Sequence, residues 1–279
     1  IYCDELRADA LGCYGHPRVR LETPHLDRLA GEGAIFRHCF TNSPICVSAR
    51  AAVLTGLYPE QTGVYCNEGA WGNFRMSREV ETFPEILARS GYATANFGKI
   101  HVPREMHPFQ LHDGEGGGMR PVAQPVRERG WEIIAPSKVP TMIGGRFPGD
   151  LPYPPERVTD NALAWLAGQD GPFLVRISYL QPHTPVFPPP PYDTLYAGMD
   201  FRRGYTERDA PEIERRFAEI TGTDELTGEQ VYLTQQYYFG LVRWIDDQVG
   251  RVVEGLRQLG RTENTMIVFH ADHGASLGE

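Results

Sequence analysis

Residues 156–183 read ERVTDNALAWLAGQDGPFLVRISYLQPH and form one helix–turn–strand unit. Apolar residues at helical spacing predict a helix over 156–169, and Gly and Pro mark the turn that follows. The run after the turn predicts a strand over 173–179, and the polar Gln181 and His183 come directly behind it. Strands that alternate with helices in this way are typical of a parallel sheet with helices on its faces.

The same alternation extends outward over the whole chain. Helices are predicted over 23–33, 46–57, 82–90 and the long apolar-periodic stretch 231–259, and strands over 1–3, 34–40, 92–97 and 265–269. Residues 102–156, rich in Gly and Pro, and residues 184–228 are predicted to be irregular and to shape substrate choice. No internal repeat is visible. The sequence therefore predicts an α/β fold with a mostly parallel central sheet and helices on both faces.

Four of the predicted strands are each followed at once by polar residues. These are Asp4 and Glu5 after the first strand, Lys99 and His101 after YATANF, His183 after FLVRISYL, and Asp272 and His273 after TMIVFHA. In an open parallel sheet, ligands bind beyond the carboxyl ends of the strands. We therefore expect these side chains to lie together at one edge of the sheet.

The set divides into two kinds of chemistry. Asp4, Glu5 and Asp272 offer the oxygen ligands that Ca²⁺, Mg²⁺ or Mn²⁺ prefers. Lys99 and the histidines of the set, which are His101, His183 and His273, suit an anionic oxygen or a leaving group. Two alternatives stay open: Asp4-Glu5 is also the pattern of a helix N-cap, and His101 and His183 are equally compatible with structural histidines.

The segment 43–51, SPICVSARA, combines a nucleophile with an anion-binding pattern. Pro44 followed by helix formers places Cys46 near a helix N-terminus, where free amides and the helix dipole favour an anion and lower the pKa of a thiol. Arg50 lies one turn further on the same face. Together they indicate sulfuryl or phosphoryl transfer. The alternative is a buried Cys with Arg50 in a salt bridge.

Composition excludes several classes of protein. The 279 residues are 41% apolar with a net charge of −9, which argues against disorder, a coiled coil and nucleic-acid binding. The longest apolar runs are too short to cross a bilayer, so no membrane interaction is predicted. Five cysteines contain no CxxC pair, and we interpret Cys3, Cys13 and Cys39 as small buried hydrophobes. These free-looking thiols favour the cytoplasm over a periplasmic or secreted location.

Five motifs in order resemble the formylglycine-dependent sulfatases of the alkaline-phosphatase superfamily. CVSAR followed by AAVLTGLYPEQTGV is similar to the family signature, and CDELRADALGCYG to its N-terminal metal motif. FGKIH resembles the GKxH motif, SYLQPHTP the PHxP motif, and FHADHG the second metal motif. The resemblance covers essentially the whole chain and implies the large catalytic domain of that family.

The resemblance also implies roles for individual residues. Cys46 would be oxidised to formylglycine by a formylglycine-generating enzyme and would supply the nucleophile. A divalent metal, Ca²⁺ first and Mn²⁺ or Mg²⁺ next, would be held by Asp4, Glu5, Asp272 and His273. The sulfate and leaving oxygen would be surrounded by Arg50, Lys99, His101 and His183, with Asn67 as a further substrate-binding residue. The expected substrate is a small-molecule or saccharide sulfate ester.

Two departures from the family pattern affect these expectations. Ser48 stands where Pro or Ala is usual, which leaves open an unmodified Cys46 and a non-catalytic relative that binds sulfated ligands. The second lysine and smaller domain expected after DHG are absent, so we interpret 1–279 as a catalytic domain truncated at both ends. A phosphonate monoester or phosphodiester hydrolase on the same scaffold is the other enzyme reading. Homo-oligomerisation stays open.

Overall fold

A five-stranded sheet lies at the centre of the computed structural model, which describes residues 1–67, 79–103, 108–113, 119–133, 143–201 and 211–277. The order is β3-β2-β6-β1-β7, and every pair of neighbours is parallel. Its strands are β1 (Tyr2–Asp4), β2 (Ala93–Gly98), β3 (Leu111–His112), β6 (Phe173–Pro182) and β7 (His270–Ala271). A two-stranded antiparallel sheet, β4 (Glu132–Ile133) with β5 (Gly144–Gly145), accompanies it. The predicted parallel sheet is confirmed.

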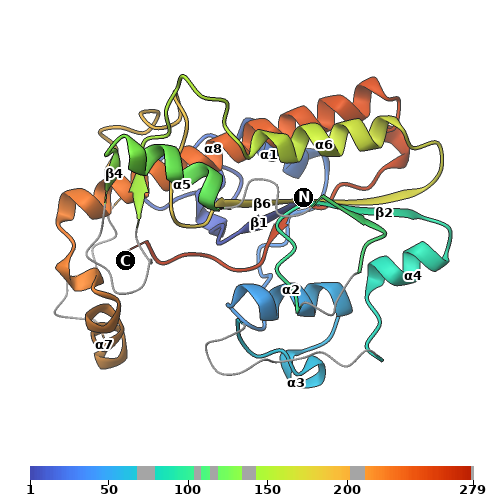
Figure 1. Cartoon of the computed structure of the whole chain (residues 1–279), viewed down its shortest axis with the longest axis horizontal. Helices are drawn as coiled ribbons and strands as arrows, with labels where there is room; N and C mark the ends of the chain where they lie inside the picture. Colours follow the sequence, from blue (N-terminus) through green and yellow to red (C-terminus); the bar gives the residue numbers. More distant parts are fainter. Residues whose placement is uncertain (68–78, 104–107, 114–118, 134–142, 202–210, 278–279) are drawn as a thin grey trace.

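Helices cover both faces of this sheet. Figure 1 shows α1 (Pro24–Glu32), α6 (Glu156–Ala167) and α8 (Gly228–Gln258) along one face. The opposite face carries α2 (Cys46–Thr55), α3 (Pro59–Thr62) and α4 (Phe83–Arg89). The helix predictions over 23–33, 46–57, 82–90, 156–169 and 231–259 are confirmed with shifts of a few residues at their ends. Among the described residues, no helix has the length and hydropathy that a bilayer crossing requires.

Three predictions about local structure were wrong, and one of them was the burial of Cys39, which is exposed. Residues 34–40 form no strand: the segment is largely solvent-exposed, with Phe40 85% exposed, and none of the described strands pairs with it. The last strand begins at His270 rather than at Thr265, because pairing with β1 starts where His270 faces Tyr2. A strand needs a hydrogen-bonded neighbour as well as suitable residues, and sequence shows only the latter.

The two stretches predicted to be irregular contain regular elements. Within 102–156 lie β3, β4, β5 and α5 (Met119–Glu128), a helix with Pro125 inside it. Within 184–228 lie α7 (Glu212–Thr221) and the short η3 (Thr223–Glu225). Two further 3-10 turns are η1 (Ala8–Ala10) and η4 (Thr262–Asn264). The internal proline conceals α5, because it breaks the usual helix pattern. Residues 104–107, 114–118, 134–142 and 202–210 of these stretches lie outside the described residues.

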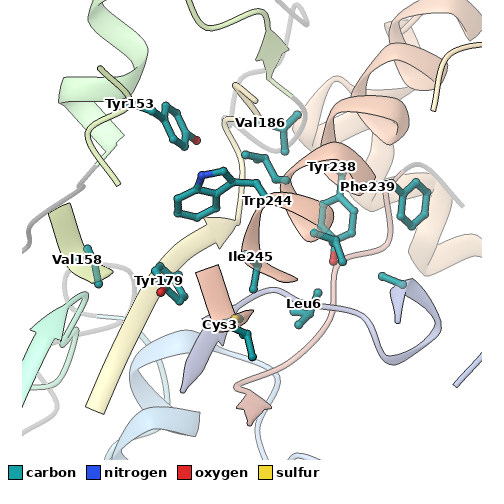
Figure 2. Close-up of a cluster of buried hydrophobic side chains, with 14 of the residues drawn as sticks. Cys3, Leu6, Tyr153, Val158, Tyr179, Val186, Tyr238, Phe239, Trp244 and Ile245 are labelled. Atoms are coloured by element: carbon teal, nitrogen blue, oxygen red, sulfur yellow. The ribbon is translucent and has the colours of Figure 1, made fainter. Parts of the chain in front are cut away.

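The main core fills the space between the sheet and α8. Trp244 of α8 is fully buried, and its ring packs edge-on against Tyr153 and Tyr179 at centroid distances of 5.2 and 5.5 Å. Figure 2 shows this aromatic group beside Ile245 and Cys3. Burial of these large rings packs α8 against β6. The sheet edge that carries the polar residues is thereby held on a rigid base.

Candidate active site

The polar residues that follow four strands meet at one edge of the sheet. The strands in question, β2, β6, β1 and β7, are consecutive neighbours and parallel, so their carboxyl ends coincide. Ligand atoms of Asp4, Cys46, Asp272 and His273 all lie within 4.8 Å of one another. Cys46 belongs to α2 and lies far from Asp272 in the sequence. The predicted convergence is therefore present, although the role of each residue stays a prediction.

Asp272 fixes the two turns that lead away from β1 and β7. Its Oδ1 accepts hydrogen bonds from the backbone amides of Glu5 and His273, at 3.0 and 2.9 Å. Glu5 has φ +58°, a left-handed backbone that is uncommon outside glycine. Burial and the nearby carboxylate of Asp4 raise the pKa of Asp272. One carboxylate thus organises the backbone on both sides of the site.

Cys46 is the first residue of α2 and its thiol points at the acidic cluster. The Sγ atom lies 3.3 Å from Asp4 Oδ1 and 3.3 Å from His273 Nε2. Burial, followed by the Asp4 carboxylate, raises the pKa of this thiol. The expected lowering by the helix N-terminus was wrong, because burial and adjacent negative charge outweigh the helix dipole here. A free thiolate nucleophile is accordingly disfavoured.

Arg50 is completely buried and links the two aspartates. Its guanidinium contacts Asp4 Oδ2 and Asp272 Oδ2, each at 3.2 Å, and Nη1 donates to Ser178 Oγ at 3.1 Å. The ring of Tyr2 lies beneath it, 4.4 Å from the ring centroid to Cζ. This planar fork is held rigidly one turn along α2 from Cys46, a geometry that suits recognition of a tetrahedral oxyanion.

Lys99 and His101 approach from the turn after β2. The ammonium group of Lys99 contacts Asp4 Oδ2, and together Arg50 and Lys99 overcome the burial of Asp4 and hold the pKa of its carboxyl below the usual range. Burial, then Lys99 and Arg50, lower the pKa of His101 to about 4. Its buried Nδ1 has no hydrogen-bond partner among the described residues. His101 is therefore a neutral ring near pH 7.

Gly98 allows this turn to form. Its φ is +86°, and a Cβ there would lie 2.2 Å from the carbonyl oxygen of Ser178 on β6. We expect Gly98→Ala to lower the free energy of unfolding by more than the roughly 1–2 kcal/mol of backbone strain alone, because a strand must also shift.

Gly91 offers a matched control for this substitution. It has φ +89° with nothing within 4 Å of an added Cβ, so Gly91→Ala carries the backbone strain without the clash. Urea unfolding of both variants measures the difference. Equal losses would show that the close approach to Ser178 is unimportant.

His183 and Glu5 form a pair beside the main cluster. His183 Nε2 lies 3.3 Å from Glu5 Oε1, and its Nδ1 contacts the carbonyl oxygen of Thr184. Glu5 belongs to a donor group with Cys46 and His183, whereas Asp4, Asp272 and His273 form the other group with Cys46. The structure thus places the Glu5 side chain against His183 instead of among the other predicted metal ligands. Asn67 lies close by, where its Oδ1 accepts from the amide of Val47 at 3.2 Å.

The donor set fits a divalent cation. Asp4 and Asp272 supply carboxylate oxygens, the ligands that Ca²⁺, Mg²⁺ and Mn²⁺ prefer, and His273 adds an imidazole nitrogen beside them. A further group of potential ligands consists of His25, Asp246 and Asp247, and both of its carboxylates pair with Arg243. Asp246 also accepts from the amides of His25 and Leu26 and so caps α1.

The comparisons agree with this geometry. The profile of the sulfatase family matches residues 1–279. The chain belongs to the sulfatase family. An arylsulfatase of Clostridium perfringens is 26% identical over 309 residues, covering 100% of this chain and 63% of that protein. An ulvan-active sulfatase of Formosa agariphila is 29% identical over 298 residues, covering 100% of this chain and 50% of that protein.

A solved structure supports the fold of this sulfatase-family chain. The crystal structure of the phosphonate monoester hydrolase of Agrobacterium radiobacter matches it with a TM-score of 0.73 at 22% identity. The match covers 100% of this chain and 63% of that one. The predicted fold is confirmed, and the chain spans 63% or less of the length of these three proteins.

Three further residues at the sulfatase-family site were missed from sequence. Tyr2 and Ser178 contact Arg50, and Arg176 contacts the turn that carries Lys99. The sequence contained a signal for Arg176, since a cation stands inside the apolar run FLVRIS. A buried charge without an ionic partner is costly and therefore indicates a specific structural or functional role. Tyr2 and Ser178 resemble ordinary strand residues and gave no such signal.

Proposed function

We propose that this chain is the catalytic domain of a sulfuric ester hydrolase that uses a divalent metal and a formylglycine derived from Cys46. The observation that carries the proposal is the approach of Cys46 Sγ to Asp4, Asp272 and His273, with ligand atoms within 4.8 Å of one another. Arg50 stands directly behind this group, in contact with both aspartates. A nucleophile, cation ligands and an oxyanion fork therefore share one position.

The proposed division of labour follows from charge and burial. Asp4, Asp272 and His273 would hold the ion, with Glu5 at their margin. When present, the ion would supply Lewis-acid activation and formylglycine would supply a hydroxyl nucleophile, which plain cysteine lacks. Arg50 and Lys99 would offset negative charge on the non-bridging oxygens of the ester.

His183 is the proposed proton donor to the leaving oxygen. His101, with its pKa lowered to about 4, is neutral near pH 7 and has little to donate. His183 is partly exposed and faces the carboxylate of Glu5, which orients the ring. The pairing assigns Glu5 a second task, orientation of the acid, beside its proposed place near the metal.

The proposed substrate is a sulfated small molecule or saccharide. The support is that relatives covering the whole of this chain include an arylsulfatase and an ulvan-active sulfatase. Local cations explain how a chain of net charge −9 would attract an anionic ester, because Arg50 and Lys99 lie at the site itself.

A phosphonate monoester hydrolase is the second candidate. The observation that favours it is the match of the fold to such an enzyme, with a TM-score of 0.73. Both esters present a tetrahedral oxyanion to the same cations, so the site chemistry is shared. Turnover of an aryl sulfate against an aryl phosphonate by full-length protein distinguishes the two.

Mass spectrometry of the tryptic peptide HCFTNSPICVSAR, residues 38–50, tests the proposed nucleophile. In protein from its native host, we expect Cys46 to have the lower mass of an aldehyde in place of a thiol. Cys39, which is exposed and lies in the same peptide, is the internal control and should remain a cysteine. A wholly unmodified Cys46 would contradict the formylglycine mechanism and support a non-catalytic ligand-binding relative.

A further inference from the structure

Arg176 is a buried cation that the proposed reaction does not use. It lies on β6, and its side chain is only 6% exposed. No carboxylate of the described residues pairs with it, whereas the buried Arg50 contacts two. Burying a cation without an anionic partner is costly, so a neutral side chain would be expected here unless the guanidinium has a task.

The guanidinium of Arg176 donates hydrogen bonds to backbone carbonyls of one turn. Arg176 Nη2 donates to the carbonyl oxygens of Lys99 and Ile100, each at 3.3 Å. Its Nε donates to Asn96 Oδ1 at 2.6 Å, and Asn96 Nδ2 donates in turn to the carbonyl oxygen of Gly98 at 3.1 Å. Three consecutive carbonyls, those of Gly98 at the end of β2 and of Lys99 and Ile100 after it, are thus held by Arg176, directly or through Asn96.

This turn needs external support. Gly98 has φ +86° and His101 has φ +42°, and the latter is a left-handed conformation that is strained for a residue with a Cβ. Lys99 reaches Asp4 of the acidic cluster from this turn, and the pKa of His101 responds to the charges of Lys99, Arg50 and Asp4. Arg50 Nη1 also donates to the carbonyl oxygen of Lys99, at 3.2 Å, so two guanidinium groups converge on a single oxygen.

The ring of Tyr2 lies against both guanidinium groups. The centroid of its ring lies 4.4 Å from Cζ of Arg50 and 5.4 Å from Cζ of Arg176. Phe109 lies against Arg176 as well, at 5.2 Å. These contacts offset part of the cost of burial and hold the guanidinium in place. Burial and then Arg50 lower the pKa of Arg176 to about 9, so the group is still charged at pH 7.

We propose that Arg176 is a positioning residue, which holds the carbonyls of Lys99 and Ile100 so that Lys99 and His101 are presented to the oxyanion. The proposal rests on the hydrolase function proposed above for the same site. The competing interpretation is that Arg176 only fills space in the sheet.

Arg176→Gln and Arg176→Lys separate these interpretations, with Ile177→Val as the control. Ile177 is the next residue of β6, and its side chain belongs to the main core. Each variant is compared at a temperature where it is fully folded. The measurements are kcat and KM for an aryl sulfate, and hydrogen exchange of the amides of residues 98–102.

For Arg176→Gln we expect kcat to fall about 10- to 100-fold with KM within about threefold, because displaced groups cost turnover more than binding. Exchange over 98–102 should accelerate about tenfold. Arg176→Lys keeps the charge but lacks the fork, so its losses should be smaller in both measurements. Ile177→Val should change neither.

The positioning role would be overturned if Arg176→Gln lowered Tm while its kcat and its exchange over 98–102 matched those of Ile177→Val. Should wild-type protein hydrolyse neither sulfate nor phosphonate, the proposed function fails, and the exchange comparison alone decides the positioning role. If Arg176→Gln does not fold, Arg176→Lys is compared with Ile177→Val, with the same two outcomes.

Discussion

Asp272→Ala is expected to abolish both stoichiometric binding of a divalent metal and turnover. Asp272 supplies one ligand atom of the four that lie within 4.8 Å, and its Oδ1 also holds the amides of Glu5 and His273. Its removal therefore takes away a ligand and loosens two neighbouring turns at once. Turnover should fall by at least about 10³-fold, since metal-assisted hydrolysis depends on the complete ligand set. Isothermal titration with Ca²⁺ and Mn²⁺ measures the first effect, and an aryl sulfate assay the second.

Asp246→Ala is the matched control for the loss of a buried carboxylate. Asp246 is as fully buried as Asp4 and belongs to a separate potential donor group, with His25 and Asp247. Because it caps α1, its replacement should lower stability by about 1–2 kcal/mol while metal stoichiometry is unchanged. If Asp272→Ala still bound stoichiometric metal and Asp246→Ala did not, the metal site would have to be assigned to the group of His25, Asp246 and Asp247 instead.

Arg50→Lys should lose most of the activity although the charge is kept. The Arg50 guanidinium touches Asp4, Asp272, Ser178 and the carbonyl of Lys99 simultaneously, and a single ammonium group cannot reproduce that set. We expect a fall in kcat of about 100-fold or more, comparable to the loss of one oxyanion-stabilising group.

Arg129→Lys is the control for replacing a guanidinium that makes two hydrogen bonds with a single ammonium group. Arg129 makes a two-pronged contact with Asp150, at 2.8 and 2.7 Å, outside the described site. It should retain wild-type kcat and stability, because an exposed ion pair contributes little. A near-wild-type rate in Arg50→Lys would remove Arg50 from the site.

The convergence of the site was predictable because it follows from topology. Polar residues after four parallel strands must lie at one edge, and the neighbours β2, β6, β1 and β7 place them there. Cys46 and Arg50 were identifiable from their one-turn spacing on a helix. The direction in which the pKa of Cys46 shifts was not predictable from sequence, because it depends on burial and on Asp4, which is 42 residues away in the sequence.

Other details depend on contacts that a single sequence does not reveal. The contact of the Glu5 side chain with His183 is one such detail, and the role of Glu5 as a metal ligand stays a prediction. The segment 34–40 has strand-forming residues but no strand partner in the described part of the chain. Helix α5 is concealed by Pro125. In each case, tertiary packing overrides local pattern.

Anomalous diffraction from crystals grown with Mn²⁺ tests most directly the central claim that these residues form one metal and oxyanion site. We expect a single strong peak between Asp4, Asp272 and His273, within coordinating distance of all three and next to residue 46. A peak at His25, Asp246 and Asp247 instead, or no peak at saturating Mn²⁺, would contradict the account.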